Sequence, residues 1–155
     1  MQQNEFDRFA DEYHSLHARS VRISGEDPEY FHRYKVRDAA ALVRDELPVP
    51  SILDFGTGVG NSLPFLREYF GSCRIVGTDV SRRSLDLARS RFESLAELRH
   101  FDGRRLPCDD GEFGMAFAAC VFNHIEHAEH SAMLTELRRV LAPGGWLILY
   151  QHNPW

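Results

Sequence analysis

The chain has 155 residues with a formal net charge of −5, and 43% of its residues are apolar and 26% charged. This composition is typical of one globular domain and argues against disorder, and the longest apolar run, residues 115–122, is far shorter than the roughly 20 residues of a membrane helix. The acidic balance gives no basic field for a phosphate backbone, so we expect neither a nucleic-acid nor a membrane partner.

The first 47 residues are predicted to be helical. Residues 4–19 carry apolar side chains three and four positions apart, which is the pattern of an amphipathic helix. A second helix is predicted to begin at Pro28, with Asp27 as its N-cap, and to end at Leu47 before Pro48. We expect this helical segment to form a lid on a core over residues 51–151, within a single domain.

From residue 51 onward, short apolar runs alternate with amphipathic stretches, which indicates an α/β fold with a mainly parallel sheet covered on both faces. A turn is expected at 143–145, where Pro-Gly-Gly precedes the last strand. The predicted strands are 51–55, 74–79, 98–102, 115–121 and 146–150, and the predicted helices are 61–70, 81–95 (capped by Ser81) and 128–141.

The strongest local signal of a ligand site is the run Asp-Phe-Gly-Thr-Gly-Val-Gly at 54–60, directly after the first predicted strand. Glycines let the main chain turn tightly and approach a ligand, although a plain strand-to-helix turn has the same composition. Dinucleotide-binding turns have their third glycine one position later, where this chain has Asn61. The spacing therefore disfavours a nicotinamide-dependent oxidoreductase, and the Tyr-x-x-x-Lys pair of such enzymes is also missing.

Two acidic residues follow later strands. Asp79 lies 19 residues after Gly60, at a position where a carboxylate accepts hydrogen bonds from ribose hydroxyls. Its alternative role is a helix cap, but Ser81 already suits that role. Asp102, followed by Gly103, could bind an exocyclic amine or simply form an Asp-Gly turn, and both interpretations remain open.

Several of these segments together resemble the motifs of class I, Rossmann-like S-adenosylmethionine-dependent methyltransferases. The segments that carry the resemblance are 52–60, 76–81, 102–110, 137–147 and the first helix at 6–14. The resemblance implies a doubly wound sheet with strand order 3-2-1-4-5 and N-terminal helices. It also implies that the chain transfers a methyl group from S-adenosylmethionine, leaving S-adenosylhomocysteine, to a small-molecule acceptor.

The same resemblance implies a set of cofactor-binding residues. Asp54 is expected to face the methionine amine and Asp79 the ribose hydroxyls, while Tyr13 covers the pocket. The complete set is Asp54, Gly56, Thr57, Gly58, Asp79, Val80, Asp102, Gly103, Cys120 and Tyr13.

The candidate catalytic residues are His124 and His127, after the fourth strand. A histidine titrates near neutral pH and can serve as a general base, although methyl transfer from a sulfonium needs one only when the acceptor must lose a proton. Ordinary surface histidines are the alternative. The spacing with His130 also suits a metal, but without a second ligand cluster we predict no metal site.

Members of this family usually continue past the fifth strand with a helix and further strands, which the printed sequence lacks, and Gly114 stands where they commonly have Asp. The fifth or the fourth strand is therefore expected at an open edge. Either the sequence is a fragment, or the N-terminal helices or a partner chain, such as a second copy in a homodimer, cover that edge. A catalytically silent S-adenosylmethionine-binding or interaction subunit is the alternative function. Three separated cysteines and the absence of a secretory signal predict a cytoplasmic protein.

Overall fold

The computed structural model describes residues 28–46 and 48–151. The predicted helix at 4–19, with Tyr13, lies outside these residues, so the helical lid stays a prediction. The described elements are α2 (Pro28–Leu42), η1 (Arg44–Glu46), β1 (Ser51–Phe55), α3 (Leu63–Phe70), β2 (Arg74–Asp79), α4 (Arg82–Phe92), β3 (Glu97–His100), β4 (Phe113–Ala119), η2 (Phe122–His124), η3 (His127–Glu129), α5 (His130–Val140) and β5 (Leu141–Tyr150).

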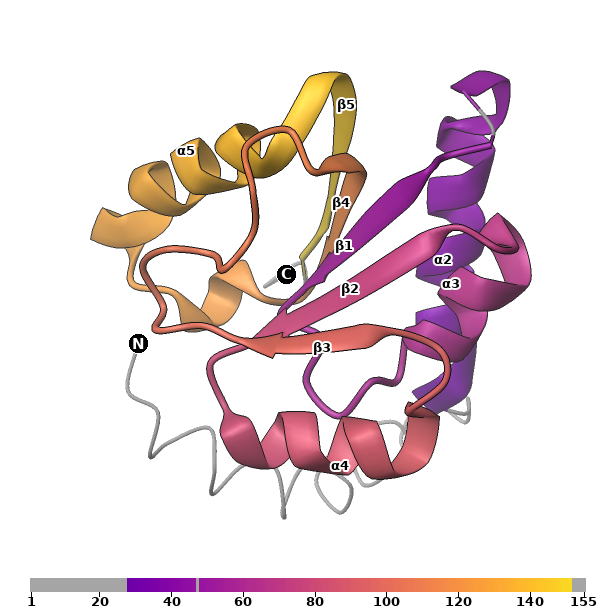
Figure 1. Ribbon diagram of the computed structural model, residues 1–155, viewed down its shortest axis with the longest axis horizontal. Coiled ribbons are helices and arrows are strands. Elements are labelled where there is room, and N and C mark those ends of the chain that lie inside the picture. The colour runs from indigo at the N-terminus through magenta and orange to yellow at the C-terminus, as the bar shows by residue number, and fades with distance from the viewer. Residues whose placement is uncertain (1–27, 47, 152–155) are drawn as a thin grey trace.

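The five strands form one sheet in the order β3-β2-β1-β4-β5, and every neighbouring pair is parallel. This order confirms the predicted doubly wound α/β fold. Figure 1 shows helices α2 and α3 on one side of the sheet, with α5 on the other. Strand β1 is buried along its whole length, as expected of a central strand in a parallel sheet.

Two apolar cores hold the layers together. One core packs α5, through side chains such as Met133 and Leu137, against Leu53 and Phe55 of β1. The other packs α2 and α3 against the opposite face, where Val36 meets strand residues such as Ile52, Met115 and Phe117. Successive residues of β1 thus face opposite cores, which explains why apolar residues follow one another directly in this strand.

Helix α2 begins beside the carboxyl ends of the strands and runs back toward their amino ends. Its first turns contact the start of α3, where His32 Nδ1 lies 3.4 Å from Ser62 Oγ. The helix ends at Leu42, five residues before the predicted end, and η1 forms the remaining turn. This geometry brings the N-terminal half of α2 to the edge of the sheet where ligands of such folds bind.

The expected turn at 143–145 is wrong, because these residues belong to β5. Between the pairs Phe113–Leu141 and Met115–Trp146, two steps along β4 face five steps along β5. The surplus residues form a bulge, which Gly144 permits with a φ of +79°. Strands β4 and β5 therefore pair on both sides of the bulge, although the bulge contains a Pro-Gly-Gly sequence.

Strands β1 and β2 have the predicted bounds, and the remaining ends, apart from those of α2 and β5 described above, differ from the predicted ones by three residues or fewer. Strand β3 ends at His100 instead of residue 102, and β4 covers 113–119 instead of 115–121. Helix α4 ends at Phe92. Ser81 is its N-cap as predicted, since Ser81 Oγ accepts a hydrogen bond from the Ser84 amide at 3.1 Å.

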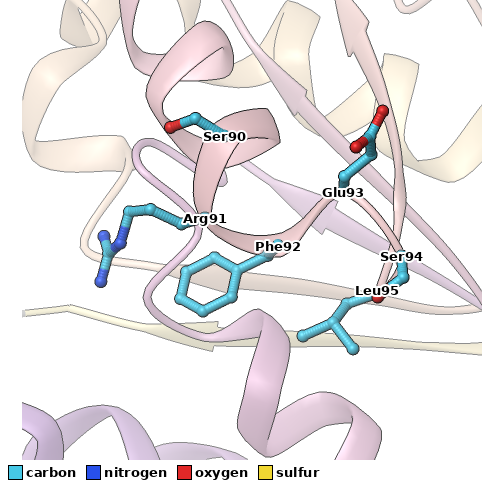
Figure 2. A pocket seen from close by; sticks show the side chains of 6 residues that line it. All are labelled: Ser90, Arg91, Phe92, Glu93, Ser94 and Leu95. Atoms are coloured by element: carbon cyan, nitrogen blue, oxygen red, sulfur yellow. The ribbon is translucent and has the colours of Figure 1, made fainter.

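A surface hollow lies at the C-terminal end of α4 (Figure 2). None of the predicted site residues lines it. Its lining residues are Ser90, Arg91, Phe92, Glu93, Ser94 and Leu95. The hollow nevertheless borders the glycine turn, because Arg91 donates a hydrogen bond to the Val59 carbonyl at 3.1 Å.

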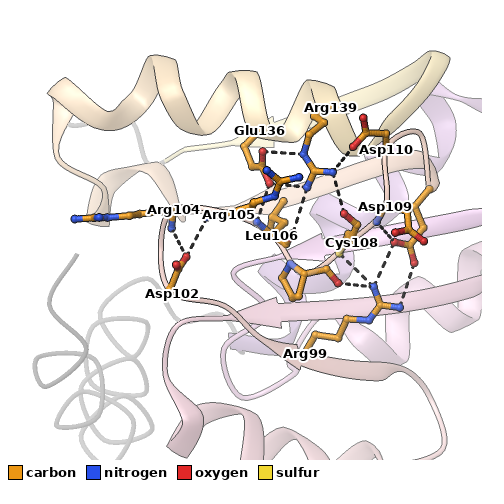
Figure 3. Close-up of polar contacts among 12 residues, drawn as sticks. Arg99, Asp102, Arg104, Arg105, Leu106, Cys108, Asp109, Asp110, Glu136 and Arg139 are labelled. Carbon is orange, nitrogen blue, oxygen red and sulfur yellow. Dashed lines mark hydrogen bonds and ion pairs between the residues drawn. The ribbon is translucent and has the colours of Figure 1, made fainter.

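Two arginines fix the segment between β3 and β4 (Figure 3). Arg139 of α5 donates hydrogen bonds to the carbonyls of Leu106 and Cys108 and pairs with Glu136 at 2.7 Å. Arg99 of β3 donates to the Pro107 carbonyl at 2.9 Å. The Arg139 guanidinium thus connects two of the sequence motifs, 102–110 and 137–147. The sequence alone did not predict this contact.

Strand β5 lies at an edge of the sheet and exposes Trp146 and Leu149, which are 40% and 39% accessible. A homodimer over this edge stays a prediction. Within the described part of the chain, no helix combines the length and apolar character needed to cross a membrane.

Candidate functional site

The glycine-rich turn leaves the end of β1 and is hydrogen-bonded to the end of β2. The amides of Gly56 and Thr57 both donate to the Thr78 carbonyl at 2.9 Å. The Gly60 amide then donates to the Thr57 carbonyl, also at 2.9 Å. The carboxyl ends of the two strands and the turn therefore form one connected unit.

Three glycines of this turn have left-handed backbone angles, but they serve different purposes. A Cβ at Gly56 would lie 2.5 Å from a methyl group of Val121, and one at Gly60 would lie 2.9 Å from the Phe92 ring. A Cβ at Gly58 would meet no atom of the described residues within 4 Å. Gly56 and Gly60 are thus required for packing, whereas Gly58 leaves open space at the tip of the turn.

Asp54 is buried at the end of β1, with 3% of its surface accessible. Its Oδ2 accepts a hydrogen bond from Thr57 Oγ1 at 2.6 Å. Burial raises the pKa of Asp54 to about 7, and the nearby charge of Asp79 adds to the rise, while the Thr57 bond opposes it. A cation placed against this carboxylate would be strongly attracted to it.

Asp79 is also buried, and its carboxylate holds two backbone amides. Oδ2 accepts from the Gly58 amide and Oδ1 from the Ser81 amide, each at 2.8 Å. Burial raises the pKa of Asp79, and these bonds work in the opposite direction because they favour the charged form. The carboxylate thus connects the glycine turn to the start of α4.

The segment after β3 forms a tight turn. Asp102 Oδ1 accepts from the amides of Arg104 and Arg105 at 2.8 and 3.0 Å, and Gly103 has a φ of +85°. These backbone bonds lower the pKa of Asp102. The geometry is that of the Asp-Gly turn, while the second carboxylate oxygen of exposed Asp102 still has hydrogen-bonding capacity. Val80 is buried in the apolar core beside this turn.

Cys120 follows β4 with a φ of +60°, a backbone angle that side-chain-bearing residues rarely adopt. Its amide donates to the Tyr150 carbonyl at 2.7 Å, which closes the ends of β4 and β5. Its Sγ accepts a hydrogen bond from Lys35 Nζ of α2 at 3.2 Å. Lys35 was not predicted as a site residue, since it belongs to no motif, although it is the chain's only lysine.

The histidine segment lies on two short 3-10 helices after β4. His124 ends η2 and His127 begins η3, and both are exposed. His130 Nε2 lies 3.1 Å from the Phe122 carbonyl and 2.9 Å from that of Ile125. Among residues 28–46 and 48–151, no group of three metal-binding side chains comes together. The roles of His124 and His127 as bases stay predictions.

The structure therefore brings most of the predicted site residues to one edge of the sheet. Asp54, the glycine turn and Asp79 are directly hydrogen-bonded to one another or to a shared strand end, and Cys120 lies at the end of the strand next to β1. Tyr13 lies outside the described residues.

Comparison with known proteins adds evidence from outside this chain. A family model described as a methyltransferase domain matches residues 52–145. A demethylmenaquinone methyltransferase from Thermus thermophilus is 35% identical over 121 residues, covering 76% of this chain and 54% of that protein. The chain spans about half the length of the curated relatives that it matches.

Solved structures agree with this result. The PH0226 protein from Pyrococcus horikoshii has a TM-score of 0.68 at 29% identity, covering 83% of this chain and 57% of that one. A chain in a complex of the Trm112 methyltransferase activator from Haloferax volcanii also has a TM-score of 0.68, at 26% identity, covering 94% of this chain and 59% of that one.

Proposed function

This chain belongs to the methyltransferase domain family, of the class I S-adenosylmethionine-dependent type, and from that premise we propose that it transfers a methyl group from S-adenosylmethionine to a small-molecule acceptor. The observation that supports this proposal is the pair of buried carboxylates, Asp54 and Asp79, around an open glycine turn at the carboxyl ends of β1 and β2. Ligands of open α/β sheets bind at this edge.

The chemistry of the donor set fits the cofactor. S-adenosylmethionine carries an ammonium, a ribose and a sulfonium, so its recognition calls for buried anions and a close main-chain approach. Asp54 would hold the ammonium, because its carboxylate is buried beside a single hydroxyl donor. Asp79 would accept from the ribose hydroxyls through lone pairs left free by the two amides it already binds.

The bound cofactor supplies an activated methyl group, so the protein has to position the reactants and exclude water more than it has to activate them. The rigid turn contributes to positioning, since Gly56 and Thr57 share one acceptor on β2. Val80 and Gly103 would border the adenine, and His124 or His127 would remove a proton from an acceptor that has one to lose.

A small-molecule acceptor is supported by the acidic charge of the chain and by relatives named for small-molecule acceptors, such as the demethylmenaquinone methyltransferase. Nucleic-acid acceptors are disfavoured because a net charge of −5 repels phosphates. We expect the reaction product to be S-adenosylhomocysteine.

The test is a calorimetric titration with S-adenosylhomocysteine, with NADH as the control ligand. We expect micromolar binding of S-adenosylhomocysteine by the wild type, no binding of NADH, and at least roughly tenfold weaker binding by Asp79→Asn. Asp86→Asn on the exposed face of α4 is the matched control and keeps wild-type affinity. Absence of binding by the wild type would refute the proposal, and binding without transfer to any acceptor in a screen would favour a silent cofactor-binding subunit.

A further inference from the structure

One cationic side chain of α2 lies at the edge of the proposed site. Lys35 Nζ donates to Cys120 Sγ at 3.2 Å, and Cys120 directly follows β4, the neighbour of the strand that leads into the glycine turn. The ammonium is half-buried between helix and sheet edge. Lys35 is the only lysine of the chain, since every other residue counted as Lys or Arg is an arginine.

The ammonium has unused hydrogen-bonding capacity. A lysine ammonium has three donors, and a thiol is a weak acceptor. Within the described part of the chain, no carboxylate lies within ion-pair distance of Lys35. Asp38, one helical turn further along α2, instead accepts a hydrogen bond from the Tyr150 hydroxyl at 2.6 Å. Among residues 28–46 and 48–151, Lys35 is therefore a cation without an anionic partner of its own.

The neighbours of Lys35 keep it in place. The Asp38–Tyr150 bond ties α2 to the end of β5, and the Tyr150 ring packs 5.8 Å from that of Phe117. Burial and the hydrogen bond to Asp38 raise the pKa of Tyr150, so its hydroxyl stays protonated and continues to donate. The helix that carries Lys35 is thus held against the ends of both β4 and β5.

Aromatic rings accompany the cation on α2. Tyr34, the residue before Lys35, is 45% accessible and stacks on Tyr30 with ring centres 6.5 Å apart. Phe31 meets Tyr30 edge to face at 5.7 Å. The Arg37 guanidinium lies 5.5 Å from the centre of the Tyr34 ring. The three rings lie within five residues of Lys35 on the same helix, so this segment of α2 suits a planar ligand that carries a negative charge.

We propose that Lys35 binds the acceptor, and that the acceptor is a planar ring compound bearing an oxygen anion, either a carboxylate or an ionised hydroxyl. The inference rests on the proposed function and names its substrate class. In this arrangement the ammonium replaces the weak thiol contact with a charge-assisted bond to the anion, while Cys120 borders both ligands.

The single lysine permits a direct test on the intact chain. Protein labelled with ¹⁵N-lysine has one side-chain ammonium signal, which is observed with S-adenosylhomocysteine present. We expect 1-naphthoate to shift this signal and the neutral 1-naphthamide to leave it unchanged. An unchanged signal up to about 1 mM naphthoate, or equal shifts with both probes, overturns the inference.

Variants supply the second measurement. Lys35→Met is expected to weaken naphthoate binding by about 10- to 100-fold, whereas Lys35→Arg retains most of it because the charge remains. Arg44→Met, which removes a cation from η1 beyond the far end of α2, is the control and keeps wild-type affinity. Wild-type naphthoate affinity in Lys35→Met overturns the inference.

S-adenosylhomocysteine affinity separates the two proposals. Wild type and Lys35→Met should bind it equally if the ammonium serves the acceptor, whereas weaker binding by Lys35→Met would assign the ammonium to the α-carboxylate of the cofactor and overturn the inference. If the wild type fails to bind it, the proposed function fails and this inference with it. If cofactor binding is intact but the probes are not distinguished, only the role of Lys35 is refuted.

Discussion

The buried carboxyl group of Asp54 makes the stability of this protein depend on pH in an unusual direction. Its pKa is about 7 in the folded chain against an ordinary value of 3.8, because burial disfavours the ionised form. An acid whose folded pKa is raised stabilises the fold below its unfolded pKa, and that contribution is lost as pH rises through the folded pKa. We therefore expect Asp54 to reduce stability progressively between about pH 4 and pH 7.

The size of the effect follows from the shift. A difference of about three pKa units, at about 1.4 kcal/mol per unit, gives a contribution on the order of 4 kcal/mol. Asparagine at this position cannot ionise but still accepts the Thr57 hydroxyl bond, so Asp54→Asn should gain stability over the wild type above pH 7.

Urea unfolding of wild type and Asp54→Asn between about pH 4.5 and pH 8 measures this difference. Only the difference matters, since the lowered pKa values of Glu97, Glu112 and Glu136 act in the opposite direction in both proteins. Asp45→Asn, an exposed residue of η1, is the control and should run parallel to the wild type. Parallel curves for Asp54→Asn would refute the burial argument.

Cofactor binding should offset the cost of ionising the buried Asp54 carboxyl group. If Asp54 faces the ammonium of S-adenosylhomocysteine, the ligand favours the ionised carboxylate, and its affinity rises about tenfold per pH unit up to pH 7. Calorimetry at pH 6 in two buffers with different ionisation heats should then report release of about 0.9 proton. Affinity that is independent of pH below 7 would mean that Asp54 and the ligand do not interact.

Three further substitutions test the packing around the site. Gly56→Ala should destabilise by about 2–3 kcal/mol because its Cβ would clash with Val121. The control is Gly144→Ala, at a similar φ of +79° and with no atom of the described residues within 4 Å of the added Cβ, and equal losses would contradict the clash. Thr78→Val should stabilise by about 1 kcal/mol, because the buried Thr78 hydroxyl has no hydrogen-bond partner among the described residues, and thermal unfolding that shows a loss would contradict this reasoning. Arg139→Met should cost about 2–4 kcal/mol and speed amide exchange across 101–112, and Arg139→Lys should not restore protection because one ammonium cannot reproduce the fork of bonds.

Local patterns predicted the sheet well, and long-range contacts explain what they missed. Continuous apolar runs located the buried strands, and Ser81 marked the start of α4, because capping and burial depend on nearby residues. The Pro-Gly-Gly segment was predicted as a turn because that sequence forms turns in isolation, but pairing with β4 on both sides keeps it within a strand. Its outcome depends on a partner that lies about thirty residues away.

The site residues, too, fall into those that local patterns predict and those that depend on long-range contacts. Asp79 was predicted because it ends a strand, and Asp54 was predicted through the resemblance to methyltransferases. Both lie near the carboxyl ends of their strands, which local patterns locate well. Lys35 gave no motif signal, since its place depends on how α2 packs across β4 and β5 through residues more than eighty positions away. A helix packed on a sheet can bring any of several residues to the edge, and only the tertiary contacts select one.

The double role of Asp79 affects how loss of binding in its variants should be interpreted. Its carboxylate holds the amides of Gly58 and Ser81, so Asp79→Asn places an amide donor against one of them and disturbs the turn even without a ligand. A ribose-directed role predicts that Asp79→Asn weakens S-adenosylhomocysteine binding more than it weakens binding of an analogue that lacks the ribose hydroxyls. Equal losses for the two ligands would assign Asp79 a positioning role through the glycine turn, because only a direct bond depends on the hydroxyls.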